Sequence, residues 1–163
     1  MKLGNALEDL RSSVNDLGDR LRRVGERHST QQDVYHMAHT LSRRMEELAF
    51  TLEPFLEAYG QEGSGQDSEA VRAVGEKVRR TISTVAGRSS KSGLLLLRDL
   101  RELFVVASGC EIDWTIVKQG AMAARDQALA DVAIVGMDET RRVIKWLTTR
   151  IKEASPQILM TAE

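Results

Sequence analysis

The apolar stretch from Val105 to Val117 contains one side chain whose type and position suggest chemistry, the carboxylate of Glu111. With a helical rotation of roughly 100° per residue, Glu111 falls between Leu100 and Phe104, inside the apolar arc of its helix. Burial of a carboxylate without a partner is costly. We therefore expect Glu111 to be paired with a cation, protonated or bound to a ligand.

Glu139 is a second inward carboxylate, on the following helix. If the two helices are antiparallel about Asp126, Glu111 lies fifteen residues before it and Glu139 thirteen after it, so the two carboxylates come roughly level. Such a pair is the beginning of a metal site, with Glu46 or Glu53 as further ligands. In the alternative that we favour, Glu111 pairs with a basic side chain. The candidates are Lys118, Arg142 and Arg150.

Asp33, His36 and His39 have the carboxylate-x-x-His-x-x-His spacing of three metal ligands along a helix. They lie mostly opposite the apolar seam of that helix, so a solvated face is the favoured interpretation. The piece from Ala38 to Arg43 also resembles the phosphoacceptor region of histidine phosphotransfer domains, which are four-helix bundles. That resemblance implies His39 as the phosphoacceptor, although Arg43 stands where those domains keep a small glycine.

Heptad spacing of apolar residues predicts that long amphipathic helices carry these side chains. The first helix is expected to have its seam from Leu3 to Val24, and the second from Val34 to Tyr59. Ser29 or Thr30 is the expected N-cap of the second helix. The glycine-rich segment from Gly60 to Asp67 is typical of a mobile connection.

Three further helices are predicted after this connection. A shorter one is expected from Ser68 to Gly87, and a long one from about Gly93 to Arg125. Asp126 is the expected cap of the last helix, which should end before Pro156, and a small residue at Gly136 would let the last two helices approach closely. The sequence thus predicts an all-α fold, an antiparallel four-helix bundle with an additional shorter or peripheral helix.

A family resemblance is carried by four stretches of the C-terminal half: Leu97 to Leu103, Asp113 to Thr115, Ala124 to Asp126 and Glu139 to Gln157. These stretches resemble uncharacterised bacterial proteins of the ferritin-like helical type. The resemblance implies a ferritin-like four-helix bundle, a type whose better-known members hold two iron or manganese ions. Those members supply two Glu-x-x-His motifs. This sequence has none, and Glu139-x-x-Arg142 stands where one would be.

The composition excludes several functional classes. The chain has 23 Lys and Arg against 24 Asp and Glu, interleaved along its length, so neither nucleic acid nor an anionic membrane is an expected partner. Its single Cys110 has no second cysteine with which to form an internal disulfide, and its charged N-terminus does not resemble a signal peptide or an anchor. We expect one cytoplasmic domain spanning residues 1–163.

The heptad seams suit self-association, because an apolar helix face must find a partner within the chain or outside it. Phe50, on the outer face of the second helix, is one candidate contact. We predict a non-catalytic, self-associating interaction or scaffold protein, homo-oligomeric, open to a protein partner and without a cofactor. The alternatives are a degenerate ferritin-like metal protein that uses Glu111 and Glu139, and, more weakly, a histidine phosphotransfer module built on His39.

Overall fold

The computed structural model describes residues 2–60 and 90–160, and every regular element in these two ranges is an α-helix. The helices are α1 (Lys2–Arg27), α2 (Gln32–Thr51), α3 (Glu53–Gly60), α5 (Ser90–Ala123) and α6 (Gln127–Met160). The prediction of an all-α fold is therefore confirmed for the described part of the chain. The connection predicted after Gly60 and the helix predicted from Ser68 to Gly87 lie outside the described residues.

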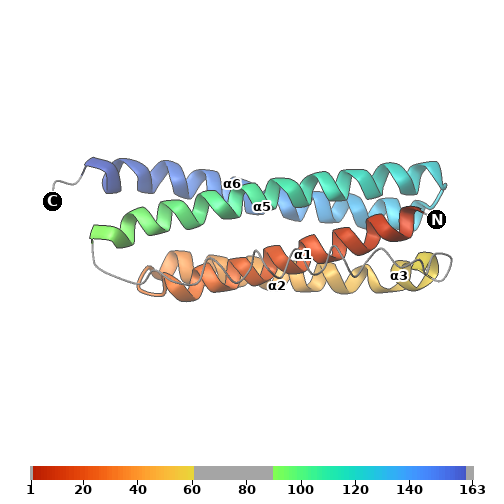
Figure 1. The fold of residues 1–163 in the computed structure, drawn as a ribbon, viewed down its shortest axis with the longest axis horizontal. Coiled ribbons are helices and arrows are strands. Elements are labelled where there is room, and N and C mark those ends of the chain that lie inside the picture. Colours follow the sequence, from red (N-terminus) through yellow and green to blue (C-terminus); the bar gives the residue numbers. More distant parts are fainter. Residues whose placement is uncertain (1, 61–89, 161–163) are drawn as a thin grey trace.

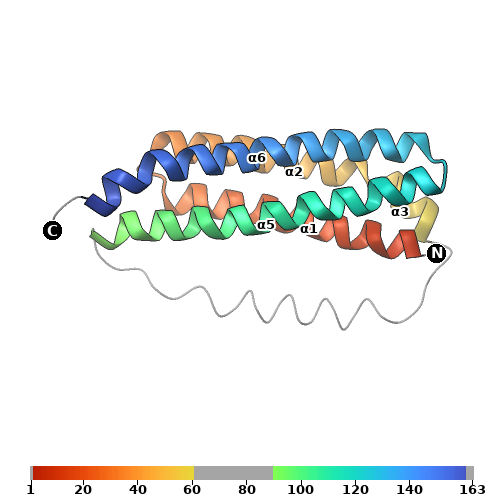
Figure 2. The ribbon, with the colours of Figure 1, turned by 90° about the horizontal axis from the view of Figure 1, so that it is seen from above.

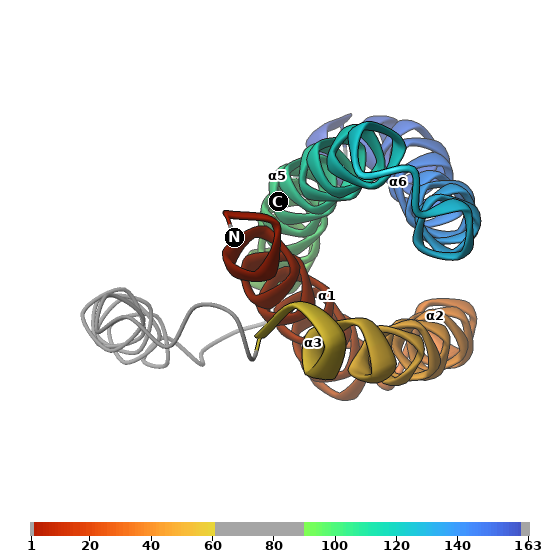
Figure 3. The ribbon, with the colours of Figure 1, turned by 90° about the vertical axis from the view of Figure 1, so that its right-hand side faces the viewer.

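Four long helices lie side by side in an elongated bundle (Figure 1). Seen from one end, they follow each other in the order α6, α5, α1 and α2 (Figure 3). Each helix runs antiparallel to the next in this series, so α2 and α5 run in the same direction (Figure 2). Gly60, at the end of α3, and Ser90, at the start of α5, consequently lie at opposite ends of the bundle.

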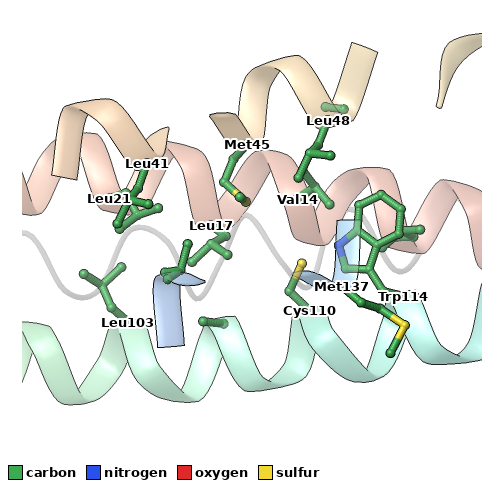
Figure 4. Close-up of a cluster of buried hydrophobic side chains, with 14 of the residues drawn as sticks. Val14, Leu17, Leu21, Leu41, Met45, Leu48, Leu103, Cys110, Trp114 and Met137 are labelled. Atoms are coloured by element: carbon green, nitrogen blue, oxygen red, sulfur yellow. The ribbon is translucent and has the colours of Figure 1, made fainter. Parts of the chain in front are cut away.

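The heptad seam predicted for α1 forms the centre of the core. Its members between the second turn and Leu21 are fully buried: Leu7, Leu10, Val14, Leu17 and Leu21. They are buried because α1 packs against α2 on one side and α5 on the other. Figure 4 shows part of this seam converging with Met45 of α2 and with Leu103 and Cys110 of α5.

Gly136 marks a very close approach of α6 to α5. A Cβ atom at this position would lie 2.4 Å from the Cε2 and Cζ2 atoms of Trp114, whose ring is fully buried. The indole therefore occupies the space that any side chain at position 136 would need. This confirms the prediction that a small residue at Gly136 lets the last two helices come close.

The turn between α5 and α6 ends one helix and starts the next within three residues. Arg125 has a φ of 58°, the left-handed conformation common just after a helix. Asp126 N donates to Ala121 O at 2.9 Å and Arg125 N donates to Met122 O at 3.1 Å, which satisfies two terminal carbonyls of α5. Asp126 Oδ1 then accepts from Leu129 N at 3.0 Å. The predicted cap of α6 is confirmed.

The second helix does not run unbroken to Tyr59 as predicted, because α2 and α3 are separated at Leu52. Pro54 has no N–H, so a continuous helix would lose the hydrogen bond to Phe50 O. The chain instead closes α2 with a tighter bond from Leu52 N to Ala49 O at 3.2 Å. Pro54 then falls in the first turn of α3, where a missing N–H costs little.

The start of α2 also differs from the prediction. Its N-cap residue is Gln31, whose side chain makes no capping hydrogen bond, rather than Ser29 or Thr30. Both of those residues belong to the preceding turn, in which Gln31 N donates to His28 O at 2.9 Å. The closure of this turn moves the start of the helix past both candidate caps.

The prediction that the last helix ends before Pro156 was wrong, since α6 continues through it to Met160. Proline in a helix removes one backbone hydrogen bond, a cost that tertiary contacts can outweigh. Here the turn after Pro156 brings Ile158 against α5, where a Cβ at Gly93 would lie 3.0 Å from the Ile158 side chain. Packing of Ile158 thus supports the extra turn of helix.

Candidate functional site

Glu111 lies on the flank of α5 that faces α6, with 27% of its side chain exposed. Arg141 Nε donates to Glu111 Oε1 at 2.6 Å, a short charge-assisted hydrogen bond. The carboxylate therefore meets a basic side chain, as in the favoured alternative, but the partner is not one of the three predicted cations. Arg141 lies fifteen residues after Asp126, as Glu111 lies fifteen before it, so the antiparallel pairing places them level.

Glu139 is held by two arginines and is only 15% exposed. Arg44 Nη1, from α2, donates to Oε2 at 3.2 Å, and Arg142 Nη1 lies 3.2 Å from Oε1. Positions 139 and 141 diverge by roughly 200° around a helix, so Glu139 points toward α2 while Arg141 points toward α5. The carboxylates of Glu111 and Glu139 therefore lie on different sides of α6.

The further ligands predicted for a metal site are also engaged elsewhere or exposed. Glu53 Oε1 accepts from Arg11 Nη1 at 3.2 Å, and Glu46 is exposed on α2. Within residues 2–60 and 90–160, no three His, Cys, Asp or Glu side chains are grouped so that they could hold a metal ion. The iron or manganese site at Glu111 and Glu139 stays a prediction, and the arginines beside both carboxylates disfavour it, since a nearby cation repels a metal ion.

The histidine motif of α2 is divided between two environments. Asp33 and His36 are exposed, in agreement with a solvated face. His39 is half-buried, its ring lies against Tyr35 with the centroids 4.4 Å apart, and its Nε2 is buried with no hydrogen-bond partner among the described residues. This nitrogen is not presented to an approaching protein. The orientation lends no support to phosphotransfer at His39, which stays a prediction.

A buried polar cluster joins the end of α1 to the start of α5. Asp99 is 5% exposed, and His28 Nε2 lies 2.7 Å from its Oδ2. Arg27 Nη1 donates to both carboxylate oxygens, at 3.0 and 3.1 Å. Sequence reasoning missed this cluster, although Asp99 lies three residues after Leu96 and four before Leu103, both core positions.

Cys110 is buried in the core beside Trp114 and Thr140. Burial raises the pKa of its thiol from 9.0 to about 12, an effect that a hydrogen bond with Thr140 partly offsets and the charge of Asp113 reinforces. The indole Nε1 of Trp114 points toward the sulfur but has no hydrogen-bond partner among the described residues (Figure 4). The thiol is thus inert in the folded protein.

We expect Cys110 to resist alkylation by a maleimide in the folded protein at neutral and mildly alkaline pH, and to react fully once the chain is unfolded. Between pH 9 and about 12 the unfolded chain loses a proton that the folded chain keeps, so stability should fall across this range. Mass spectrometry of the alkylated protein with and without denaturant measures the difference. Fast modification in native buffer would contradict the burial of this thiol.

The outer face of α5 is exposed and carries no charge over more than half of the helix. Eight residues between positions 104 and 123 are exposed: Phe104, Val105, Gly109, Ile112, Ile116, Gln119, Met122 and Ala123. The exposed residues of α1, by contrast, are all polar or charged: Lys2, Asn5, Glu8, Asp9, Ser12, Asn15, Arg22, Arg23, Glu26 and Arg27. Helix α5 is therefore apolar on two opposite faces, of which the bundle buries one.

A groove of about 500 Å³ lies between α2 and α6. Three apolar side chains, three cations and two threonines line it: Met37, Leu41, Trp146, Arg44, Arg142, Lys145, Thr40 and Thr149. It combines a mainly apolar lining with basic groups at its edges. That combination differs from the uncharged outer face of α5, so the described part of the molecule presents two surfaces of different chemistry.

No helix in the described ranges has the length and apolar character needed to cross a membrane. Comparison of the whole chain with models of known protein families, with curated proteins and with solved structures finds no match in any of the three.

Proposed function

We propose that this protein is a self-associating helical scaffold in which two copies pack through the outer face of α5. One observation carries the proposal: eight exposed residues of this face, spread over several turns, include no charged side chain. Val105, Ile112 and Ile116 are each more than half exposed. A contiguous apolar strip of this kind is unusual on a monomer and is typical of a protein interface.

The spacing of the strip suits a second helix. Val105, Gly109, Ile112 and Ile116 follow steps of four, three and four residues, the repeat of a helix-packing seam. Gly109 has no packing role among the described residues, since a Cβ atom there would meet none of them within 4 Å. A glycine inside a helix is unfavourable by roughly 0.5–1 kcal/mol relative to alanine. Close approach of another helix at this position supplies a reason for it.

The charge pattern favours a second copy of the same chain as the partner. A two-fold interface places one surface against itself, so an uncharged face is complementary to its own copy. In an antiparallel pair centred between Gly109 and Ile112, Val105 of one copy lies level with Ile116 of the other. The basic Arg98 then lies level with the uncharged Ala123, which avoids repulsion between like charges.

The size of the strip predicts a reversible dimer. A seam of about 28 Å by about 10 Å covers roughly 300 Å² per copy, whereas a standard interface buries about 800 Å² per partner. Phe104, Met122 and Ile134 extend the apolar surface toward α6, where Ile134 lies seven residues before Arg141, the residue that contacts α5. We expect dissociation in the micromolar range.

Analytical ultracentrifugation between about 1 and 100 μM tests the proposal, because mass action makes a dimer concentration-dependent. The wild-type protein should change from monomer to dimer over this range, and Ile112→Glu should remain a monomer throughout. Phe50→Glu is the matched control, since Phe50 is 79% exposed on α2 and was the contact predicted from the sequence. Circular dichroism of each variant confirms that the fold is retained.

Two results would overturn this proposal. The first is a wild-type protein that stays monomeric across the whole concentration range, which would show that the chain does not self-associate. A dimer that survives Ile112→Glu but is lost in Phe50→Glu uses the face of α2 instead of the face of α5.

A ferritin-like topology is the finer part of the proposal for the fold. It is supported by the shared direction of α2 and α5 and by the positions of Gly60 and Ser90 at opposite ends of the bundle. One long crossover connection between two helix pairs produces this arrangement in ferritin-like bundles. The proposal concerns the path of the chain only, and it does not depend on a metal.

A further inference from the structure

The groove lies between α2 and α6, on a side of the bundle where these two described helices make few contacts. In Figure 3 the series from α6 through α5 and α1 to α2 forms an open curve, and α2 and α6 make few contacts with each other. Eight side chains line this groove, whose volume is about 500 Å³. The fourth side of the bundle is thus incompletely closed by the described residues.

Long polar side chains bridge the two helices at the ends of this opening. Arg44 of α2 reaches Glu139 of α6, and Arg150 of α6 reaches Asp33 of α2, where Nη1 and Oδ2 are 2.7 Å apart. Arg150 Nη2 also donates to Gln31 Oε1 at 3.1 Å. The apolar lining residues Met37, Leu41 and Trp146 lie between these bridges.

The surface of the groove has an apolar floor. Leu41 is buried, Trp146 is half-buried against the core, and Met37 is exposed. Tryptophan and methionine are enriched at protein interfaces, where methionine adapts its shape to a partner. The floor therefore offers anchor positions for apolar side chains of a bound segment.

The rim of the groove has an excess of positive charge. Arg44, Arg142 and Lys145 contribute three cations, while Glu139 supplies one carboxylate, shared by the two arginines. Lys145 has no ion-pair partner among the described residues. The net charge of this set is +2, so the groove favours an anionic partner.

We propose that the α2–α6 groove binds an acidic amphipathic helix of a partner protein. A helix laid between α2 and α6 would place its apolar side chains on the floor and its flanking carboxylates beside Arg142 and Lys145. The lining covers positions 37–44 of α2 and 142–149 of α6, about 10 Å along each helix, so the groove accommodates about two turns of such a helix.

Two segments of this chain lack the required charge. Residues 68–87 contain four basic and two acidic side chains, so their net charge of +2 has the sign of the rim itself. The outer face of α5 carries no carboxylate among its eight exposed residues from 104 to 123. The groove therefore differs in chemistry from the proposed dimer face, and the two proposals stand independently.

A fluorescein-labelled peptide of about 18 residues, long enough for five helical turns, is the probe. It carries leucine at positions i, i+3, i+4 and i+7 of each repeat and glutamate on both flanks. One control peptide has the same composition in scrambled order, and a second has lysine in place of every glutamate. Fluorescence anisotropy should show saturable binding of the acidic amphipathic peptide alone, weakened by added salt.

Variants of the protein locate the binding site. Lys145→Glu breaks no described ion pair, so it should fold normally and weaken peptide binding by about tenfold. Met37→Glu, which introduces a charge into the exposed floor, should weaken binding similarly. Lys152→Glu is the matched control on the same helix, exposed and outside the groove, and it should leave the affinity unchanged.

The proposal is wrong if the acidic peptide does not bind, or if it binds with equal affinity to the wild-type protein and to Lys145→Glu. Equal binding of the scrambled peptide would show a charge effect without a helical groove. Saturable binding of a long-chain fatty acid with no binding of the peptide would assign the groove to a small amphiphile instead.

Discussion

Replacement of Asp99 by alanine should lower the free energy of unfolding by about 3 kcal/mol, because it breaks a buried ionic cluster from one side. Asp99 accepts hydrogen bonds from Arg27 and lies 2.7 Å from His28 Nε2, and both Asp99 and His28 are about 5% exposed. Removal of the carboxylate strands the His28 ring and frees Arg27, and it leaves a small cavity beside the core. Urea unfolding followed by circular dichroism measures the loss.

Two controls separate this effect from the general loss of a charge. Asp138→Ala removes an exposed carboxylate of α6 whose nearest ion pair, with Arg141, is 3.9 Å long, and it should change stability by less than about 0.5 kcal/mol. A double-mutant cycle with His28→Ala should give a coupling of about 1–3 kcal/mol between positions 28 and 99. A coupling near zero would mean that the His28 contact contributes nothing to stability.

Heptad spacing predicted the buried seam of α1 correctly because the exposed residues of that helix are all polar or charged, so the helix has only one apolar face. The same method misplaced Glu111. The apolar arc predicted for this helix included Phe104, which is large and apolar but exposed. The buried seam of α5 passes instead through Leu103, Cys110 and Trp114, about 90° away around the helix. Glu111 therefore lies on a flank of α5, where Arg141 can reach it.

The sequence does not show which face of α5 the bundle buries. Helix α5 is apolar on two opposite faces, so periodicity alone cannot say which face the bundle buries. Asp99 occupies a core position between Leu96 and Leu103, where periodicity predicts an apolar side chain rather than a charged one. Its partners come from the end of α1, some seventy residues earlier, and such a contact leaves no local signal.

The boundaries of the helices were predicted less well than their faces, for a related reason. Pro54 and Pro156 are equally strong local breakers, yet α2 ends before the first while α6 continues through the second. Whether the helix continues past the proline depends on whether the residues after the proline make tertiary contacts. Ile158 packs against α5 beyond Pro156, and a sequence shows the proline but not this contact.

Gly136→Ala should lower the free energy of unfolding by about 2 kcal/mol, although alanine is intrinsically the better helix former by about 1 kcal/mol. A Cβ at position 136 would lie 2.4 Å from the Trp114 ring, which is fully buried and cannot move without disturbing the core. Overpacking of a rigid aromatic ring therefore outweighs the gain in helix propensity. Chemical denaturation of the two proteins measures the change.

Combining Gly136→Ala with Trp114→Leu tests the cause, since a smaller side chain at 114 removes the clash. The double variant should be more stable than the sum of the two single changes predicts, by about 1 kcal/mol or more. Additive effects would show that the ring is not what excludes a side chain from position 136.

Gly109→Ala is the opposite case on the same pair of helices, and it also bears on the proposed dimer. A Cβ at Gly109 meets no atom within 4 Å in the part of the chain that the structure describes, so alanine should stabilise the dilute monomer by about 0.5–1 kcal/mol. In a dimer packed through the outer face of α5, however, the new methyl group separates the two helices. Gly109→Ala should therefore unfold at higher denaturant concentration when dilute and dimerise more weakly in the ultracentrifuge. A variant that gains stability with no change in dimerisation would place the interface away from Gly109.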